Sequence, residues 1–196
     1  MRKLLTVYMS GLALVLCLDA GCITSREGQM PPITQWPPAA KPVKPSISLT
    51  VNGKVIQNGN EQDVMSTTRV QQWRTLIARA YQESELFSAV KEGTSDTDLV
   101  AEINVLDRND YSGVLAFITG FTYGLVPSSE SHAFTLSTTL KNQQGLPIST
   151  INMQETRTTW IQLFLLFAMP FQSAENDLVY DLNRATIQEA RGKGHL

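Results

Sequence analysis

The chain has 196 residues, with 16 basic and 18 acidic side chains and a formal net charge of −2. A chain without a basic excess attracts nucleic acid poorly, so we expect no nucleic-acid partner. Two cysteines and two histidines offer no metal-ligand spacing, which leaves no basis for a metal or cofactor. The counts therefore leave proteins, lipids and apolar molecules as partners.

The N-terminal segment 1–21 has the layout of a secretory signal peptide. Arg2 and Lys3 precede a short apolar run over 12–18, and an Ala-Gly pair stands directly before Cys22. A basic start, an apolar core and a small-residue cleavage site are the three parts of such a signal. The apolar run is shorter than the roughly 20 residues that a spanning helix needs, which favours cleavage over an uncleaved anchor.

The sequence Asp19-Ala20-Gly21-Cys22 resembles the lipobox of bacterial lipoproteins, although Asp19 stands where that family usually has Leu or Val. The resemblance implies cleavage before Cys22 and acylation of its thiol and its new amino group. Ile23, in place of Asp, implies an outer-membrane anchor that faces the periplasm. A secreted protein cut nearby without acylation is the alternative.

The chain is also similar to small lipid-anchored α/β proteins of the Gram-negative envelope, through Leu76–Phe87 and the following Leu99–Leu106. Such proteins include auxiliary components of transport, secretion and envelope-assembly machines. The resemblance implies a periplasm-facing module held to the outer membrane.

Residues 22–45 are predicted to be a tether. Six of the nine prolines of the chain lie in this segment. Proline fixes φ and removes a main-chain donor, so we expect a semi-extended linker without packed structure. At about 3.1 Å per residue it would reach up to roughly 70 Å from the lipid anchor.

Residues 46–192 are predicted to be one α+β domain, followed by a short tail over 193–196. The Asn-Gly pair at 52–53, between two apolar runs, predicts a hairpin turn. Apolar periodicity predicts the other elements. The expected strands are 47–51, 54–57, 99–106, 133–141 and 148–158, and the expected helices are 67–90 and 173–193. The resulting fold class is a two-layer sandwich: a mostly antiparallel sheet of about four strands packed by two helices.

Two uncharged apolar inserts, 111–126 and 160–171, interrupt this pattern. Each follows a strand of the expected meander, so both should emerge at the same end of the sheet and form one lobe. Neither can cross a bilayer and return, and an exposed apolar patch of this size marks a membrane or protein contact. Closure of the domain's own core is the alternative. The residues predicted to make the contact are Phe117, Phe121, Tyr123, Trp160, Phe164, Leu165 and Phe167.

No combination of nucleophile, base and orienting group stands out, so we predict that the protein is not an enzyme. Asp107 and Asp110 are interpreted as a solvated turn at the end of a strand, with a Ca²⁺ or catalytic site as the alternative. The leading hypothesis is a lipid-anchored scaffold or adaptor that binds an envelope protein. The alternative is a periplasmic carrier or sensor that shelters a lipid or another apolar ligand beneath the two inserts. A hydrolase is a third class, for which no residue can be nominated.

Overall fold

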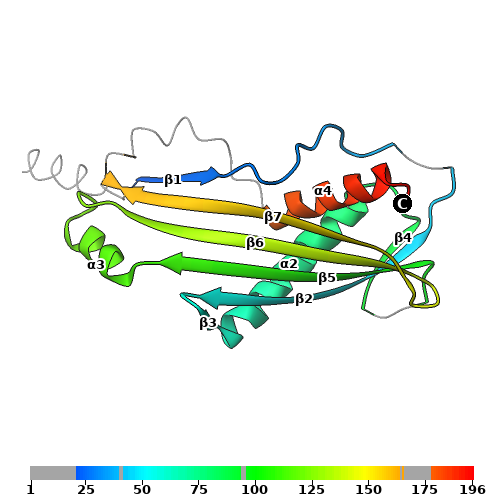
Figure 1. Cartoon of the computed structure of the whole chain (residues 1–196), viewed down its shortest axis with the longest axis horizontal. Helices are drawn as coiled ribbons and strands as arrows, with labels where there is room; N and C mark the ends of the chain where they lie inside the picture. Colours follow the sequence, from blue (N-terminus) through cyan, green and yellow to red (C-terminus); the bar gives the residue numbers. More distant parts are fainter. Residues whose placement is uncertain (1–20, 40–41, 94–95, 164, 166–177) are drawn as a thin grey trace, which may run out of the picture. The chain divides into compact units, whose positions relative to one another are not determined.

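The computed structural model describes residues 21–39, 42–93, 96–163, 165 and 178–196. Within these residues the chain forms an α+β fold with three helices and seven strands (Figure 1). In chain order they are β1 (Gly21–Arg26), β2 (Ser46–Gln57), β3 (Asn60–Glu61), α2 (Asp63–Glu83), β4 (Ala89–Glu92), β5 (Leu99–Tyr111), α3 (Gly113–Phe121), β6 (Ser128–Asn142), β7 (Pro147–Gln162) and α4 (Leu178–Gly192).

The sheet corrects the predicted fold class. It has seven strands in the order β1-β7-β6-β5-β2-β3, and β4 pairs with β2 off this path. The sheet is mixed, because β2 pairs in parallel with both β4 and β5. The expectation of about four, mostly antiparallel strands was wrong because β1 and β4 lie in segments that we interpreted as tether and as helix.

β2 can pair in parallel with β4 and β5 because α2 lies between them in the chain. The chain leaves β2, crosses through α2 and returns as β4 and β5, which is the arrangement that parallel neighbours require. β2 runs without interruption through Asn52 and Gly53, which pair with Asn104 and Val105 of β5. The predicted hairpin at this Asn-Gly pair was therefore wrong. The turn lies at Asn58-Gly59, where both residues have positive φ.

The first predicted helix begins earlier and ends earlier than expected. α2 spans Asp63–Glu83, and Glu85 has a φ of +56°, which ends the helical path. Ser66 lies inside the helix, where its hydroxyl accepts a hydrogen bond of 2.9 Å from the Val55 main-chain nitrogen. The second predicted helix began at 173; α4 covers Leu178–Gly192, and residues 166–177 lie outside the described part.

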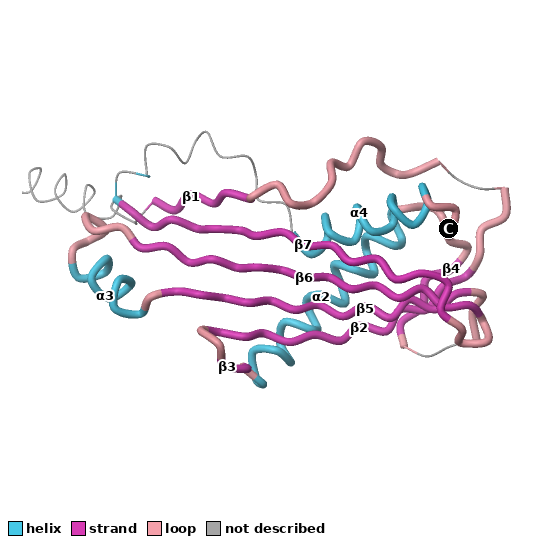
Figure 2. Tube along the Cα trace, viewed as in Figure 1, coloured by secondary structure: helices cyan, strands magenta, loops and turns pink. Residues whose placement is uncertain are grey.

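The described residues group into two compact units. The first consists of residues 21–25, 111–130, 158–163 and 165, and the second of residues 26–39, 42–93, 96–110, 131–157 and 178–196. The first contains α3, and the second contains α2 and α4 (Figure 2).

The second unit holds the hydrophobic core. α2 packs against α4 and against β2. Alternate residues of the strands face this core, as period-two burial requires. The largest fully buried side chains are Ile47, Val55, Ile77, Tyr81, Ile103, Leu136, Leu140, Ile151, Glu155, Leu182, Asn183 and Ile187.

Polar contacts add to the packing of α2 against α4. The Tyr180 hydroxyl of α4 donates a hydrogen bond to Glu83 of α2, and Arg79 pairs with the same carboxylate at 2.9 Å. The Arg79 guanidinium also lies 4.7 Å from the centre of the Tyr180 ring. Hydrogen bonds from Arg79 and from Tyr180 hold the pKa of Glu83 below its ordinary value.

The close approach of Trp73 to Gly53 gives a stability prediction. A Cβ at Gly53 would lie 2.5 Å from the Trp73 ring and 2.9 Å from the Val105 main-chain oxygen. Because neither neighbour can move freely in a packed core, Gly53→Ala should lower the free energy of unfolding by about 1–3 kcal/mol in urea denaturation. Gly113→Ala is the matched control, since its nearest new contact is 3.9 Å away. Equal losses in the two variants would contradict the packing argument.

Candidate functional site

The first unit carries an exposed apolar surface. Phe117, Phe121 and Tyr123 are 73%, 77% and 79% exposed, and Trp160 is 48% exposed. We call this set, together with Val114, Leu115 and Leu125, the aromatic surface. An apolar patch of this kind on a protein surface marks a contact with another protein or with a membrane.

Helix α3 presents most of the aromatic surface. Ser112 begins the helix, since its hydroxyl accepts a hydrogen bond of 3.3 Å from the Leu115 main-chain nitrogen. Phe117 and Phe121 are four residues apart, so they lie on one helical face, and their rings stack with centroids 6.3 Å apart. Thr119 is the buried residue of this helix. The helix thus exposes the apolar side chains that a helix in a soluble domain normally buries.

A main-chain contact joins the two predicted inserts. The Leu163 nitrogen donates a hydrogen bond of 2.8 Å to the Gly124 oxygen. Gly124 has a φ of +80°, and a Cβ there would lie 2.9 Å from the Leu163 nitrogen. Only glycine combines a positive φ with space for the Leu163 main chain at low cost. Gly124 therefore suits the point where the first insert contacts the second.

The remaining predicted contact residues belong to the second insert. Leu165 is half-buried, and Phe164 and Phe167 lie outside the described residues. Trp160 is thus the described aromatic residue of this insert, and it lies on β7.

Cys22, the predicted acylation site, lies on β1 in the same unit as the aromatic surface. The Thr24 and Thr159 hydroxyls are 3.3 Å apart, and the Glu27 nitrogen donates to the Thr156 oxygen at 3.0 Å. These contacts set an antiparallel register between β1 and β7, and the same register places Cys22 opposite Ile161. It places Ile23, the next residue, opposite Trp160.

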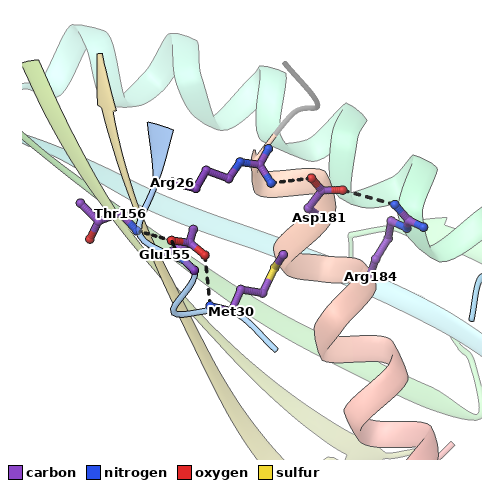
Figure 3. Close-up of polar contacts among 7 residues, drawn as sticks. Arg26, Met30, Glu155, Thr156, Asp181 and Arg184 are labelled. Atoms are coloured by element: carbon purple, nitrogen blue, oxygen red, sulfur yellow. Dashed lines mark hydrogen bonds and ion pairs between the residues drawn. The ribbon is translucent and has the colours of Figure 1, made fainter. Parts of the chain in front are cut away.

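Residues 26–39, which we call the strap, are docked and do not form the extended tether that the sequence predicted. The Glu155 carboxylate accepts hydrogen bonds from the main-chain nitrogens of Gly28 at 3.0 Å and Met30 at 3.1 Å (Figure 3). It also accepts one of 3.1 Å from the Thr156 nitrogen. Glu155 is only 2% exposed, so these three donors replace the water that its charge loses on burial.

Side chains of α4 hold the strap along the rest of its length. Arg26 pairs with Asp181 at 2.8 Å, and Arg184 pairs with the same carboxylate at 3.3 Å (Figure 3). The Arg184 guanidinium lies 4.9 Å from the centre of the Trp36 ring. Gln188 donates a hydrogen bond of 2.7 Å to Thr34. Because Met30, Ile33 and Trp36 also pack against the core, the prolines rigidify a bound segment.

The structure also corrects the interpretation of Asp107 as part of a solvated turn. Asp107 lies within β5, is 1% exposed and contacts the His132 imidazole of β6 at 2.9 Å. The imidazole stacks on Phe134. The signal that finds Asp107 is the phase of the strand, because it continues the buried alternation of Ile103 and Val105. In β7 the same alternation predicts that Glu155 is buried, because it follows the buried Ile151 and Met153 at a spacing of two.

The described residues hold no group of three or more His, Cys, Asp or Glu side chains arranged to bind a metal ion. Among them, no helix combines the length and apolar character that a membrane crossing requires.

Comparisons with known proteins do not show a family. No family model matches the chain, and no curated protein matches its sequence. Among solved structures, it is similar to a neuraminyllactose-binding hemagglutinin homolog from Helicobacter pylori, at 8% identity and a TM-score of 0.36, over 65% of this chain and 66% of that one. It is also similar to PelC from Paraburkholderia phytofirmans, solved as a dodecamer, at 6% identity and a TM-score of 0.30, over 84% and 96%.

The Glu155 contacts give a prediction for the strap. Glu155→Gln keeps the side-chain shape but turns one acceptor oxygen into a donor, so a main-chain N–H of the strap loses its partner. We expect the free energy of unfolding to fall by roughly 1.5–3 kcal/mol and the Gly28 and Met30 amides to exchange hydrogen faster. Glu102→Gln is the control, since it removes the part-exposed pair with Lys141 and should cost at most about 1 kcal/mol. Unchanged exchange at Gly28 and Met30 would contradict the role given to Glu155.

Proposed function

We propose that this protein is a lipid-anchored component of the cell envelope that lies directly against a membrane and serves there as a non-enzymatic scaffold or adaptor. Acyl chains on Cys22 would hold the protein to the outer membrane from the periplasmic side. The aromatic surface would form the second membrane contact.

One observation carries this proposal: Cys22 and the aromatic surface lie in the same compact unit, and the residue after Cys22, Ile23, lies opposite Trp160 in the register of β1 and β7. Lipidated proteins bind membranes stably when two independent signals act together. An acylated Cys22 supplies the first signal, and tryptophan and phenylalanine side chains at the bilayer interface supply the second.

The pairing of β1 leaves no room for a linker next to the proposed anchor. The cysteine that carries the lipid would be the first residue of the mature chain and also belongs to β1, which pairs with β7. No linker then separates the acyl chains from folded structure. We therefore replace the expectation of a long reach into the periplasm with contact at the membrane surface.

The exposure of the aromatic side chains favours contact over enclosure. A carrier or sensor that sheltered an apolar ligand would surround it with buried side chains. Phe117, Phe121 and Tyr123 are instead more than 70% exposed. This supports the scaffold hypothesis over the carrier alternative.

Trp160 provides a direct test of the membrane contact. The acylated full-length product is reconstituted into vesicles that contain phosphatidylcholine brominated on its acyl chains, and tryptophan fluorescence is recorded. The chain has three tryptophans; Trp73 is buried in the second unit and Trp36 packs there against Arg184. We expect quenching that Trp160→Phe removes and that Trp36→Phe retains. Equal fluorescence in brominated and ordinary vesicles would refute contact by the aromatic surface.

The lipid anchor is tested separately by intact mass and membrane fractionation of the wild type and Cys22→Ala. We expect the wild type to be cleaved before Cys22, to carry acyl chains and to fractionate with the outer membrane, and the variant to lose all three properties. A wild type that is soluble and unacylated would contradict the anchor. An unacylated protein that still binds membranes would assign the attachment to the aromatic surface alone.

A further inference from the structure

The second unit has an open stretch of sheet edge on β2. One side of β2 pairs with β5 along its whole length, from Ile47 to Gln57. The other side pairs with β4 only at 46–49 and with β3 only at 56–57. Residues 50–55 therefore have no strand on that side within the described part of the chain.

The register identifies which main-chain groups face the open edge. The Leu49 and Val55 oxygens face this side, because they accept hydrogen bonds from Gly93 and Gln62 at 2.9 Å each. Main-chain groups alternate in direction along a strand, so the N–H and C=O of Val51 and Gly53 point the same way. Val55 is satisfied by Gln62 and Ser66, which leaves two donors and two acceptors, on Val51 and Gly53, for an added strand.

A hollow of about 270 Å³ adjoins these groups. It is lined by Leu49, Thr50, Val51, Asn52, Arg74, Glu92 and Gly93. Arg74, from α2, is half-buried and forms no hydrogen bond or ion pair in the part of the chain that the structure describes. Its guanidinium is therefore not engaged by a described acidic side chain and is available to an anionic group in the hollow. Glu92 is exposed, where water and salt screen its charge.

We propose that this hollow binds the C-terminal end of a partner protein as an added β-strand, with the terminal carboxylate on Arg74. Strand addition uses main-chain hydrogen bonds for affinity, and the four groups of Val51 and Gly53 supply them. Arg is the side chain best suited to hold a carboxylate through two parallel hydrogen bonds.

The closed ends of the open stretch of β2 favour a chain terminus over an internal segment. Gly93 binds Leu49 at one end, and Gln62 binds Val55 at the other. At about 3.3 Å per residue, the open stretch accommodates only a few residues of an added strand. An internal segment would have to bend away at both ends, whereas a chain end needs to leave in one direction only.

The test uses random heptapeptides displayed with a free C-terminal carboxylate, selected on the acylated protein in detergent. The strongest binder is then synthesised as the free acid and as the C-terminal amide. We expect the amide to bind the wild type at least tenfold more weakly than the acid. Arg74→Gln should lose at least tenfold in affinity for the acid and should not distinguish the two peptides. Bound peptide should slow hydrogen exchange at the Val51 and Gly53 amides.

Arg69→Gln, an exposed position on the same helix, is the matched control and should bind both peptides as the wild type does. Thermal unfolding of each variant shows whether the fold is retained. Failure to enrich any peptide, equal affinity of the wild type for acid and amide, or unchanged exchange at Val51 and Gly53 would each overturn the proposal. These results are independent of membrane contact, which is measured by Trp160 quenching.

Discussion

The burial of the Glu155 carboxylate is the constraint on which the N-terminal part of the second unit depends. A carboxylate that is 2% exposed must replace its lost water, and it does so with the main-chain nitrogens of Gly28, Met30 and Thr156. Two of these donors, Gly28 and Met30, belong to the main chain of the strap, so the hydrogen bonds hold its backbone in place whatever its side chains are. Cys22, the proposed acylation site, lies six residues before Gly28 in the sequence and belongs to β1, so an acyl chain there would be joined to a residue of the sheet.

Local patterns predicted the parts of the candidate membrane site that are encoded locally. Cys22 was nominated because the segment before it resembles a signal that is recognised as linear sequence, and Phe117 and Phe121 were nominated because they lie in an uncharged run. The docking of the strap was missed because its acceptor, Glu155, lies more than 120 residues away in the sequence. The open edge of β2 could not be predicted either, because it depends on where β4 ends, at Glu92, along the neighbouring strand.

The two Asn-Gly pairs show why the sheet topology was mispredicted. Asn52-Gly53 and Asn58-Gly59 carry the same local turn signal, yet only the second pair turns. At Gly53 the Trp73 ring occupies the space that a Cβ would need, so a residue without a side chain is required there. A non-local packing contact therefore overrides the turn preference, and β2 continues to twelve residues in parallel with β5.

A second membrane contact adds orientation to attachment. Acyl chains on one residue hold a protein at a bilayer but leave it free to rotate about the point of attachment. In the proposed function, the stacked pair of Phe117 and Phe121 would supply a separate contact, on a helix after which Gly124 binds Leu163 of the second insert. Two contacts within one compact unit restrict that rotation, so the first unit would present a defined face to the membrane. A fixed orientation would help a scaffold, because its binding face is then already positioned for a partner and less freedom is lost on binding.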